Sequence, residues 1–159
     1  MYSNKQISKT DVPAKRVDIV SVKLVREGSC TFKSRFINNP ADAVSLVEPF
    51  LADCDREKVI VLCLDTKAQP TAISTCSVGT VNSSLIHPRE LFKESILCNA
   101  ASVILAHNHP SGIPTPSEDD ISITKRLSEA GKVLGIDVID HVIIGSNGNY
   151  KSFKELGLL

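Results

Sequence analysis

Residues 101–120 have the sequence ASVILAHNHPSGIPTPSEDD, and this stretch predicts a buried strand, a restricted loop and the start of a helix. The apolar run before His107 is typical of a strand that is buried on both faces. Three prolines and a glycine follow His109, so the loop has few conformations and can return the chain to a fixed place. Ser117 is the predicted start of the helix. The stretch therefore joins a strand end to a helix start through a stiff connection.

Polar side chains at the two ends of this loop can hold a metal ion. His107 and His109 are two residues apart at a strand end, so their side chains project to the same face. Asp120 lies in the first turn of the predicted helix, where its carboxylate can be a third ligand. Two histidines and one aspartate leave a fourth position for water, as in a catalytic zinc site. Bound zinc lowers the pKa of that water to about 7.

The same residues also have an explanation without metal. Ser117 and Asp120 have the spacing of a helix capping box, with aspartate in place of the usual glutamate or glutamine. An aspartate in a first helical turn is favoured by the helix dipole as well. The letters HNH suggest a nuclease, but that motif needs a ββα-metal context and a proline-rich loop follows here. Spacing alone leaves the metal site and the helix cap both open.

Strands and helices are predicted to interleave along the chain. We expect strands at 17–25, 31–37, 58–65, 71–81, 101–109, 136–145 and 150–153, and helices at 40–51, 87–99 and 117–134. This alternation predicts an α/β fold, a mixed β-sheet sandwiched by helices. Residues 1–16 are polar and aperiodic. We therefore expect a flexible N-terminal tail at 1–16 and one domain at 17–159.

Composition excludes several classes of protein. The five cysteines are scattered and form no C-x-x-C pair, which argues against a disulfide framework and a cysteine-rich zinc site. No apolar run approaches the roughly 20 residues of a membrane helix. The polar N-terminus lacks the apolar core of a signal peptide. We therefore expect a cytoplasmic protein without a membrane partner.

Charge is unevenly distributed although the formal net charge is zero. Residues 1–35 hold eight lysines and arginines against three acidic residues, a net charge of +5. Such a basic segment can contact DNA or an acidic partner. The alternative is a solvated segment without a partner, because strong nucleic-acid binders are usually more basic overall.

The polar motif resembles a known family. His-x-His, seven residues, Ser, two residues and Asp is the JAMM motif, which His107, His109, Ser117 and Asp120 satisfy. The longer strings AHNHPSGIPTPSEDD and LSEAGKVLGIDVIDHVIIG closely resemble RadC-like proteins of the JAMM/MPN+ metalloprotease superfamily. The segments VIVLCLDTK and GTVNSSLIHPRELF are similar to the same family. The resemblance covers about residues 40–159.

This resemblance implies a fold and a set of roles. The fold would be of the JAB1/MPN (cytidine-deaminase-like) type. His107, His109 and Asp120 would bind Zn2+, and Ser117 would stabilise the oxyanion of a tetrahedral intermediate. Many RadC-like proteins have an N-terminal helix-hairpin-helix region, but residues 17–37 are predicted as strands here. The chain therefore resembles the short form without that region.

The resemblance also implies a glutamate that acts as general base. Glu57 is the best match, because it directly precedes the predicted strand KVIVLCLD. Glu48 and Glu90 are the alternatives, and Glu90 also fits an ordinary acidic first helical turn. The remaining histidines, His87 and His141, are predicted to be structural.

Two functions of different class follow. The first is a zinc-dependent metallopeptidase or isopeptidase that acts on a peptide or protein substrate. The second is a DNA-repair-associated binding or scaffold module that uses the basic residues 1–35. A deaminase is disfavoured, because deaminases of the related fold carry a C-x-x-C signature that this chain lacks.

Overall fold

A mixed five-stranded sheet forms the centre of the protein. The computed structural model describes residues 15–79 and 86–159. The strands are β1 (Lys58–Leu64), β2 (Pro70–Val78), β3 (Ser102–Asn108), β4 (Asp137–Ile144) and β5 (Tyr150–Ser152). Their order in the sheet is β2-β1-β3-β4-β5. Neighbouring strands run antiparallel except β3 and β4, which are parallel.

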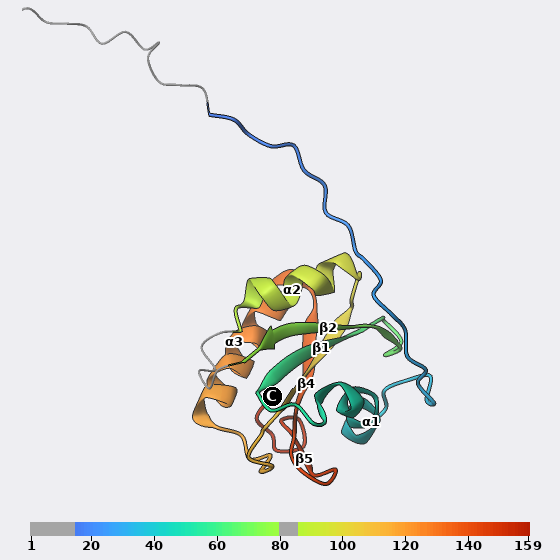
Figure 1. Ribbon diagram of the computed structural model, residues 1–159, viewed down its shortest axis with the longest axis vertical. Coiled ribbons are helices and arrows are strands. Elements are labelled where there is room, and N and C mark those ends of the chain that lie inside the picture. Colours follow the sequence, from blue (N-terminus) through green and yellow to red (C-terminus); the bar gives the residue numbers. More distant parts are fainter. Residues whose placement is uncertain (1–14, 80–85) are drawn as a thin grey trace, which may run out of the picture.

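In the described part of the chain, three helices cover the sheet from both sides. Helix α1 (Pro40–Leu51) packs on one face, and α2 (Pro88–Leu97) and α3 (Glu118–Leu134) pack on the other (Figure 1). The predicted α/β fold with a mixed sheet between helices is confirmed.

Alternation along β1 and β3 explains why both strands are apolar throughout. Odd-numbered side chains such as Val61 and Leu105 belong to the core beneath α2 and α3. Even-numbered ones such as Leu62 and Ile104 belong to the core beneath α1. A strand buried on both faces needs apolar residues at every position. His107 continues the odd-numbered series of β3, so its side chain faces α3.

Particular residues set the ends of α1 and α3. Asn39 caps α1 by accepting a hydrogen bond from the backbone N–H of Asp42, and Pro40 occupies the first helical position. Pro49 lies inside α1, and the helix ends two residues later at Leu51. Gly135 ends α3 with a φ of 71°, a left-handed conformation that glycine adopts without strain.

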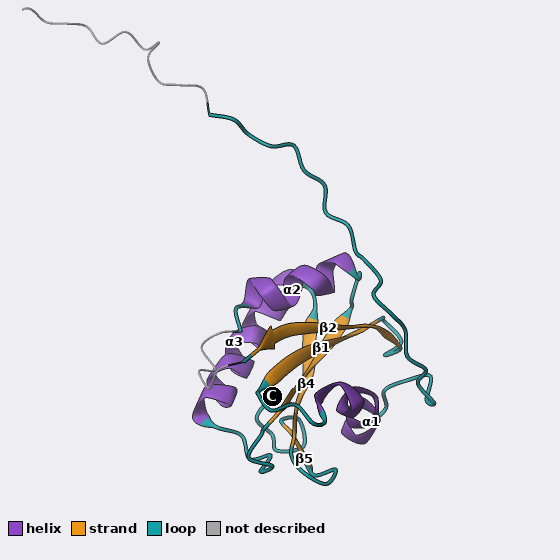
Figure 2. Cartoon of the chain, in the orientation of Figure 1, coloured by secondary structure: helices purple, strands orange, loops and turns teal. Residues whose placement is uncertain are grey.

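The two strands predicted at 17–25 and 31–37 are wrong. Residues 15–30 form neither helix nor strand and leave the domain as an extended arm (Figures 1 and 2). Ile19 is 103% exposed, so the alternating apolar side chains contact no core. Alternation satisfies the local requirement for a strand, but the strand also needs a neighbouring backbone to bond with, and no described strand pairs with this segment. Most of the predicted tail at 1–16, and the last two residues of the strand predicted at 71–81, lie outside the described residues.

None of the helices in the described part of the chain is long and apolar enough to span a bilayer.

Candidate metal centre

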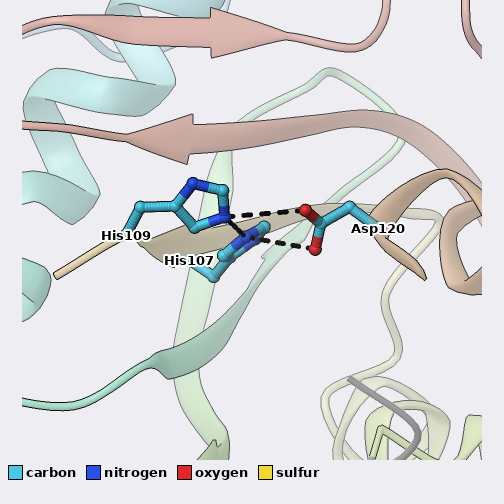
Figure 3. A group of neighbouring side chains, drawn as sticks. All are labelled: His107, His109 and Asp120. Carbon is cyan, nitrogen blue, oxygen red and sulfur yellow. Dashed lines mark hydrogen bonds and ion pairs between the residues drawn. The ribbon is translucent and has the colours of Figure 1, made fainter. Parts of the chain in front are cut away.

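Three predicted ligands converge where β3 ends and α3 begins. The Nε2 atoms of His107 and His109 are 3.0 Å apart. His107 Nε2 lies 3.4 Å from Asp120 Oδ1, and His109 Nε2 lies 3.5 Å from Asp120 Oδ2. Figure 3 shows the three side chains pointing toward one another. Among the described residues, these are the three whose ligand atoms meet within 4.8 Å of one another.

Strand pairing positions the two histidines. His107 pairs with Val59 on β1 and with Ile143 on β4, so neighbours on both sides fix its backbone. The N–H of His109 donates to the carbonyl of Ile144 at 2.9 Å, which extends the pairing by one step beyond β3. Both imidazoles therefore leave the same face of a continuous sheet.

The loop after His109 is fixed against the turn between β4 and β5. The Gly112 carbonyl accepts a hydrogen bond from the Ser146 N–H at 2.9 Å. A Cβ at Gly145 would lie 2.4 Å from the Gly112 oxygen, so only glycine permits this approach. Gly112 itself has a φ of 79°. These contacts bring the chain back to α3 along one defined path.

Asp120 is held by the capping box that the sequence also suggested. The Ser117 backbone N–H and hydroxyl donate to Asp120 Oδ2 at 2.8 and 2.6 Å. The Asp120 N–H donates in return to Ser117 Oγ at 3.1 Å. Helix cap and candidate ligand thus coexist, because the cap orients the carboxylate toward the histidines. The oxyanion role of Ser117 stays a prediction.

The second nitrogen of each imidazole has its own partner. His109 Nδ1 donates to the Ile113 carbonyl at 2.8 Å, and His107 Nδ1 lies 2.8 Å from His141 Nε2. Metal-binding histidines are usually oriented in this way by a partner on the nitrogen that does not bind the metal. Each ring therefore directs its Nε2 toward the point that it shares with Asp120.

The three donor atoms fit a zinc-like ion. Bonds of about 2.0–2.1 Å in tetrahedral geometry place ligand atoms roughly 3.3 Å apart. The two Nε2 atoms are 3.0 Å apart, and each lies 3.4 or 3.5 Å from a different oxygen of the Asp120 carboxylate, so the separations lie close to that value. Three ligands of this type also leave one tetrahedral position for a water or substrate.

Charge at the site is distributed as a cation site requires. Burial alone would raise the pKa of the Asp120 carboxyl, but hydrogen bonds from His109 and Ser117 outweigh it and hold that pKa well below its usual range. Burial lowers the pKa of His107 to about 4. The hydrogen bond to Asp120 raises the pKa of His109 and so favours the protonated form of its imidazole. A cation that binds would displace that proton.

Glu57 directly precedes β1, next to the end of β3 that carries the histidines. Val59 pairs with His107, and continuing this antiparallel register by two residues places Glu57 opposite His109. The negative charge of Glu57 contributes to the raised pKa of His109. The backbone carbonyl of Glu57 is fixed by the Gly79 N–H at 2.9 Å. This placement supports Glu57 as the base.

The alternative glutamates are less well placed. Glu48 lies on α1, across the sheet from the histidines. Glu90 lies on α2 and forms a 2.6 Å ion pair with Lys93. The assignment of the base to Glu57 stays a prediction.

Asn108 was not singled out from the sequence, yet it connects the histidines to Glu57. Its Oδ1 accepts from the Lys58 N–H at 2.8 Å, and its Nδ2 donates to the Arg56 carbonyl at 3.0 Å. These two bonds flank Glu57 in the chain. The sequence signal was an amide placed between two histidines at the end of a buried strand.

The other histidines differ in their surroundings. His87 is exposed at the N-cap of α2 and makes no side-chain capping bond. His141 is fully buried, and it contacts His107 and Thr124, which lies 2.6 Å from its Nδ1. His141 therefore supports the site rather than the core alone. The sequence analysis predicted neither the contact between His141 and His107 nor the contact between His141 and Thr124.

Comparisons with known proteins agree with the geometry. A family model for the RadC-like JAB domain matches residues 37–158. A UPF0758 protein from Desulforamulus reducens is 56% identical over 123 residues, covering 77% of this chain and 54% of that protein. A UPF0758 protein from Methanosarcina barkeri is 42% identical over 171 residues, covering 99% of this chain and 74% of that protein. The chain spans about half the length of the first of these relatives. The resemblance predicted from the motif is confirmed.

The metal-free protein should be most stable near pH 6.5. Burial lowers the pKa of both His107 and His141, so below about pH 6.5 the unfolded chain binds more protons and stability falls toward pH 4. Each of these histidines lowers the free energy of unfolding by up to about 1.4 kcal/mol for each pH unit below that point. The raised pKa of His109 acts in the opposite sense, and its contribution is lost as pH rises through that pKa. Urea unfolding in the presence of a chelator, repeated across this pH range, measures the loss of stability on the acid side and on the alkaline side.

The exposed His87 provides the control for this pH profile. The variant His87→Ala should keep the same acid limb, because no buried imidazole has changed. A stability that stays flat between pH 6.5 and pH 4 would contradict the assignment of neutral, buried His107 and His141.

Proposed function

Because the chain belongs to the RadC-like JAB domain family, we propose that it is a zinc-dependent hydrolase that cleaves an amide bond in a peptide or protein. The convergence of His107, His109 and Asp120 carries this proposal. A helix cap alone would explain Asp120 but not two imidazoles directed at the same carboxylate. The family match supports the same chemistry without naming a substrate.

A zinc ion at this position would lower the pKa of a bound water to about 7 and polarise the carbonyl to be attacked. The chain supplies the geometry around it. His107 and His109 would bind through Nε2, because their Nδ1 atoms are engaged by His141 and Ile113. Asp120 would bind through its carboxylate, which Ser117 orients.

Glu57 would move the proton. Its carboxylate would accept a proton from the attacking water and pass it to the nitrogen of the leaving amine. A positioned base of this kind contributes about 10²- to 10⁴-fold in rate. The bonds of Asn108 to the residues before and after Glu57 restrict the backbone that carries the base.

Ser117 can divide its two functions between two atoms. Besides the hydroxyl, the backbone N–H of Ser117 donates to Asp120 Oδ2 at 2.8 Å. This second hydrogen bond would keep the carboxylate oriented when the hydroxyl turns away. The hydroxyl, which donates to Asp120 in this structure, would then donate to the oxyanion. Such a donor contributes about 3 kcal/mol to transition-state stabilisation.

Replacing one ligand should remove the metal. Wild-type protein incubated with zinc and dialysed should retain about one zinc per chain, the number expected for one tetrahedral site. His109→Ala should lose it, because two ligands cannot close the site. Elemental analysis measures both, and His87→Ala is the matched control with an exposed histidine. A wild type that retains no zinc would contradict the proposed function.

Replacing the base should remove activity but leave the metal. Glu57→Gln should keep its zinc and lose about 10²- to 10⁴-fold in hydrolysis of a peptide or isopeptide substrate. Glu48→Gln and Glu90→Gln are the controls, because Glu48 lies on α1 across the sheet from the histidines and the Glu90 carboxylate is paired with Lys93. Full activity in Glu57→Gln together with loss in either control would move the base to that glutamate.

A second candidate function is contact with DNA through the N-terminal arm. Four exposed basic side chains lie on the described part of the arm and two more lie between the arm and α1, namely Lys15, Arg16, Lys23, Arg26, Lys33 and Arg35. Binding to duplex DNA that weakens with salt, and that is lost when these six residues become alanine, would favour this candidate.

A further inference from the structure

A chain of hydrogen bonds leads from the backbone of α3 to the inner side of His107. Thr124 Oγ1 donates to the Asp120 carbonyl oxygen at 2.6 Å and lies 2.6 Å from His141 Nδ1. His141 Nε2 lies 2.8 Å from His107 Nδ1. Thr124 is 1% exposed, His141 0% and His107 3%, so water cannot replace any of these partners.

The chemistry of the first bond sets the direction of all the others. A carbonyl oxygen only accepts, so the single hydroxyl proton of Thr124 is committed to Asp120. Thr124 Oγ1 must then accept from His141, which places a proton on His141 Nδ1. A neutral imidazole carries one proton, so His141 Nε2 is an acceptor and His107 Nδ1 donates to it. His107 Nε2 therefore carries a lone pair and no proton.

The surroundings keep His141 neutral and fixed in this orientation. His141 is 0% exposed, and burial disfavours the charged form of an imidazole. Phe153 stacks on the ring with centroids 4.6 Å apart and planes inclined by 22°. Asp140 holds the turn that carries Phe153, because its carboxylate accepts from the Ser152 hydroxyl at 2.7 Å and the Lys154 N–H at 3.0 Å.

We propose that Thr124 and His141 are positioning residues that hold His107 in its Nδ1–H tautomer, with the Nε2 lone pair directed at the metal position before any metal arrives. The inference rests on the proposed metal site for its purpose, but the tautomer is a property of the metal-free chain. A ligand with the wrong tautomer must move a proton before it can bind, so a fixed tautomer favours metal binding.

Loss of the Thr124 hydroxyl should reverse the direction of the hydrogen bond between His141 and His107. In Thr124→Val, a proton on His141 Nδ1 would be buried without an acceptor, which is costly. The other tautomer places that proton on Nε2, where it would donate to His107 Nδ1. His107 would then carry its own proton on Nε2, directed at the metal position. Valine keeps the shape of threonine, so packing changes little.

The test reads the ring nitrogens directly. Long-range ¹H–¹⁵N spectra of metal-free protein with ¹⁵N-labelled histidine, in mildly alkaline buffer, distinguish protonated from unprotonated nitrogens. Wild type should show His107 protonated on Nδ1, and Thr124→Val should show it protonated on Nε2 or mixed. Zinc affinity, from competition with a chelating dye, should weaken about 10- to 100-fold in Thr124→Val. Thr124→Ser keeps the hydroxyl and should restore both results.

Ser95→Ala is the matched control. Ser95 is also fully buried in a helix and donates to the carbonyl four residues back, at 2.9 Å, but it contacts no histidine. This variant should lose stability without changing zinc affinity or any tautomer. A wild-type His107 protonated on Nε2, or unchanged zinc affinity in Thr124→Val, would overturn the proposal. If the wild type has the Nδ1–H tautomer of His107 but binds no zinc, the hydrogen-bond chain from Thr124 to His107 stands and the proposed function is overturned instead.

Discussion

The structure depends on a constraint at one strand end, where the buried His107 imidazole, the half-buried His109 imidazole and the buried Asp120 carboxylate lie together. Removing such groups from water costs several kcal/mol for each unpaired group, so each needs a partner. Among the described residues, no buried side-chain nitrogen or oxygen lacks a hydrogen-bond partner. His141, Ile113 and Ser117 form hydrogen bonds with His107, His109 and Asp120, respectively. The two Nε2 atoms and the carboxylate of Asp120 then point toward one another. A cation is the ligand that such an arrangement accommodates.

The fold supplies those partners from separate segments. β3 is flanked on both sides by other strands, so His107 and the first residue beyond β3 have fixed backbones. The capping box of α3 delivers Asp120, and Thr124, one turn later on the same helix, reaches His141 on β4. Helix α3 is thus connected to the histidines twice. Asp120 contacts His107 directly, and Thr124 contacts His141, which in turn contacts His107. This double connection explains why one helix start can carry both a cap and a ligand.

Much of this was predictable from local pattern. The apolar runs indicated the strands of the sheet, and Ser117 indicated the start of α3, because those signals act within a few residues. The ligand set followed from side-chain periodicity and from the motif. The strand predicted at 17–25 was wrong because a strand depends on a partner that no local pattern can show. Asn108, Thr124 and His141 were missed as support for the site for a related reason, since their roles arise from contacts between segments distant in the chain.

The proposed function requires one metal ion between His107, His109 and Asp120. Anomalous diffraction at the zinc absorption edge, from crystals of zinc-loaded protein, tests this directly. The account predicts a single strong peak within about 2.0–2.2 Å of both Nε2 atoms and a carboxylate oxygen of Asp120. A peak at another site, or none in protein that was exposed to zinc, would contradict it.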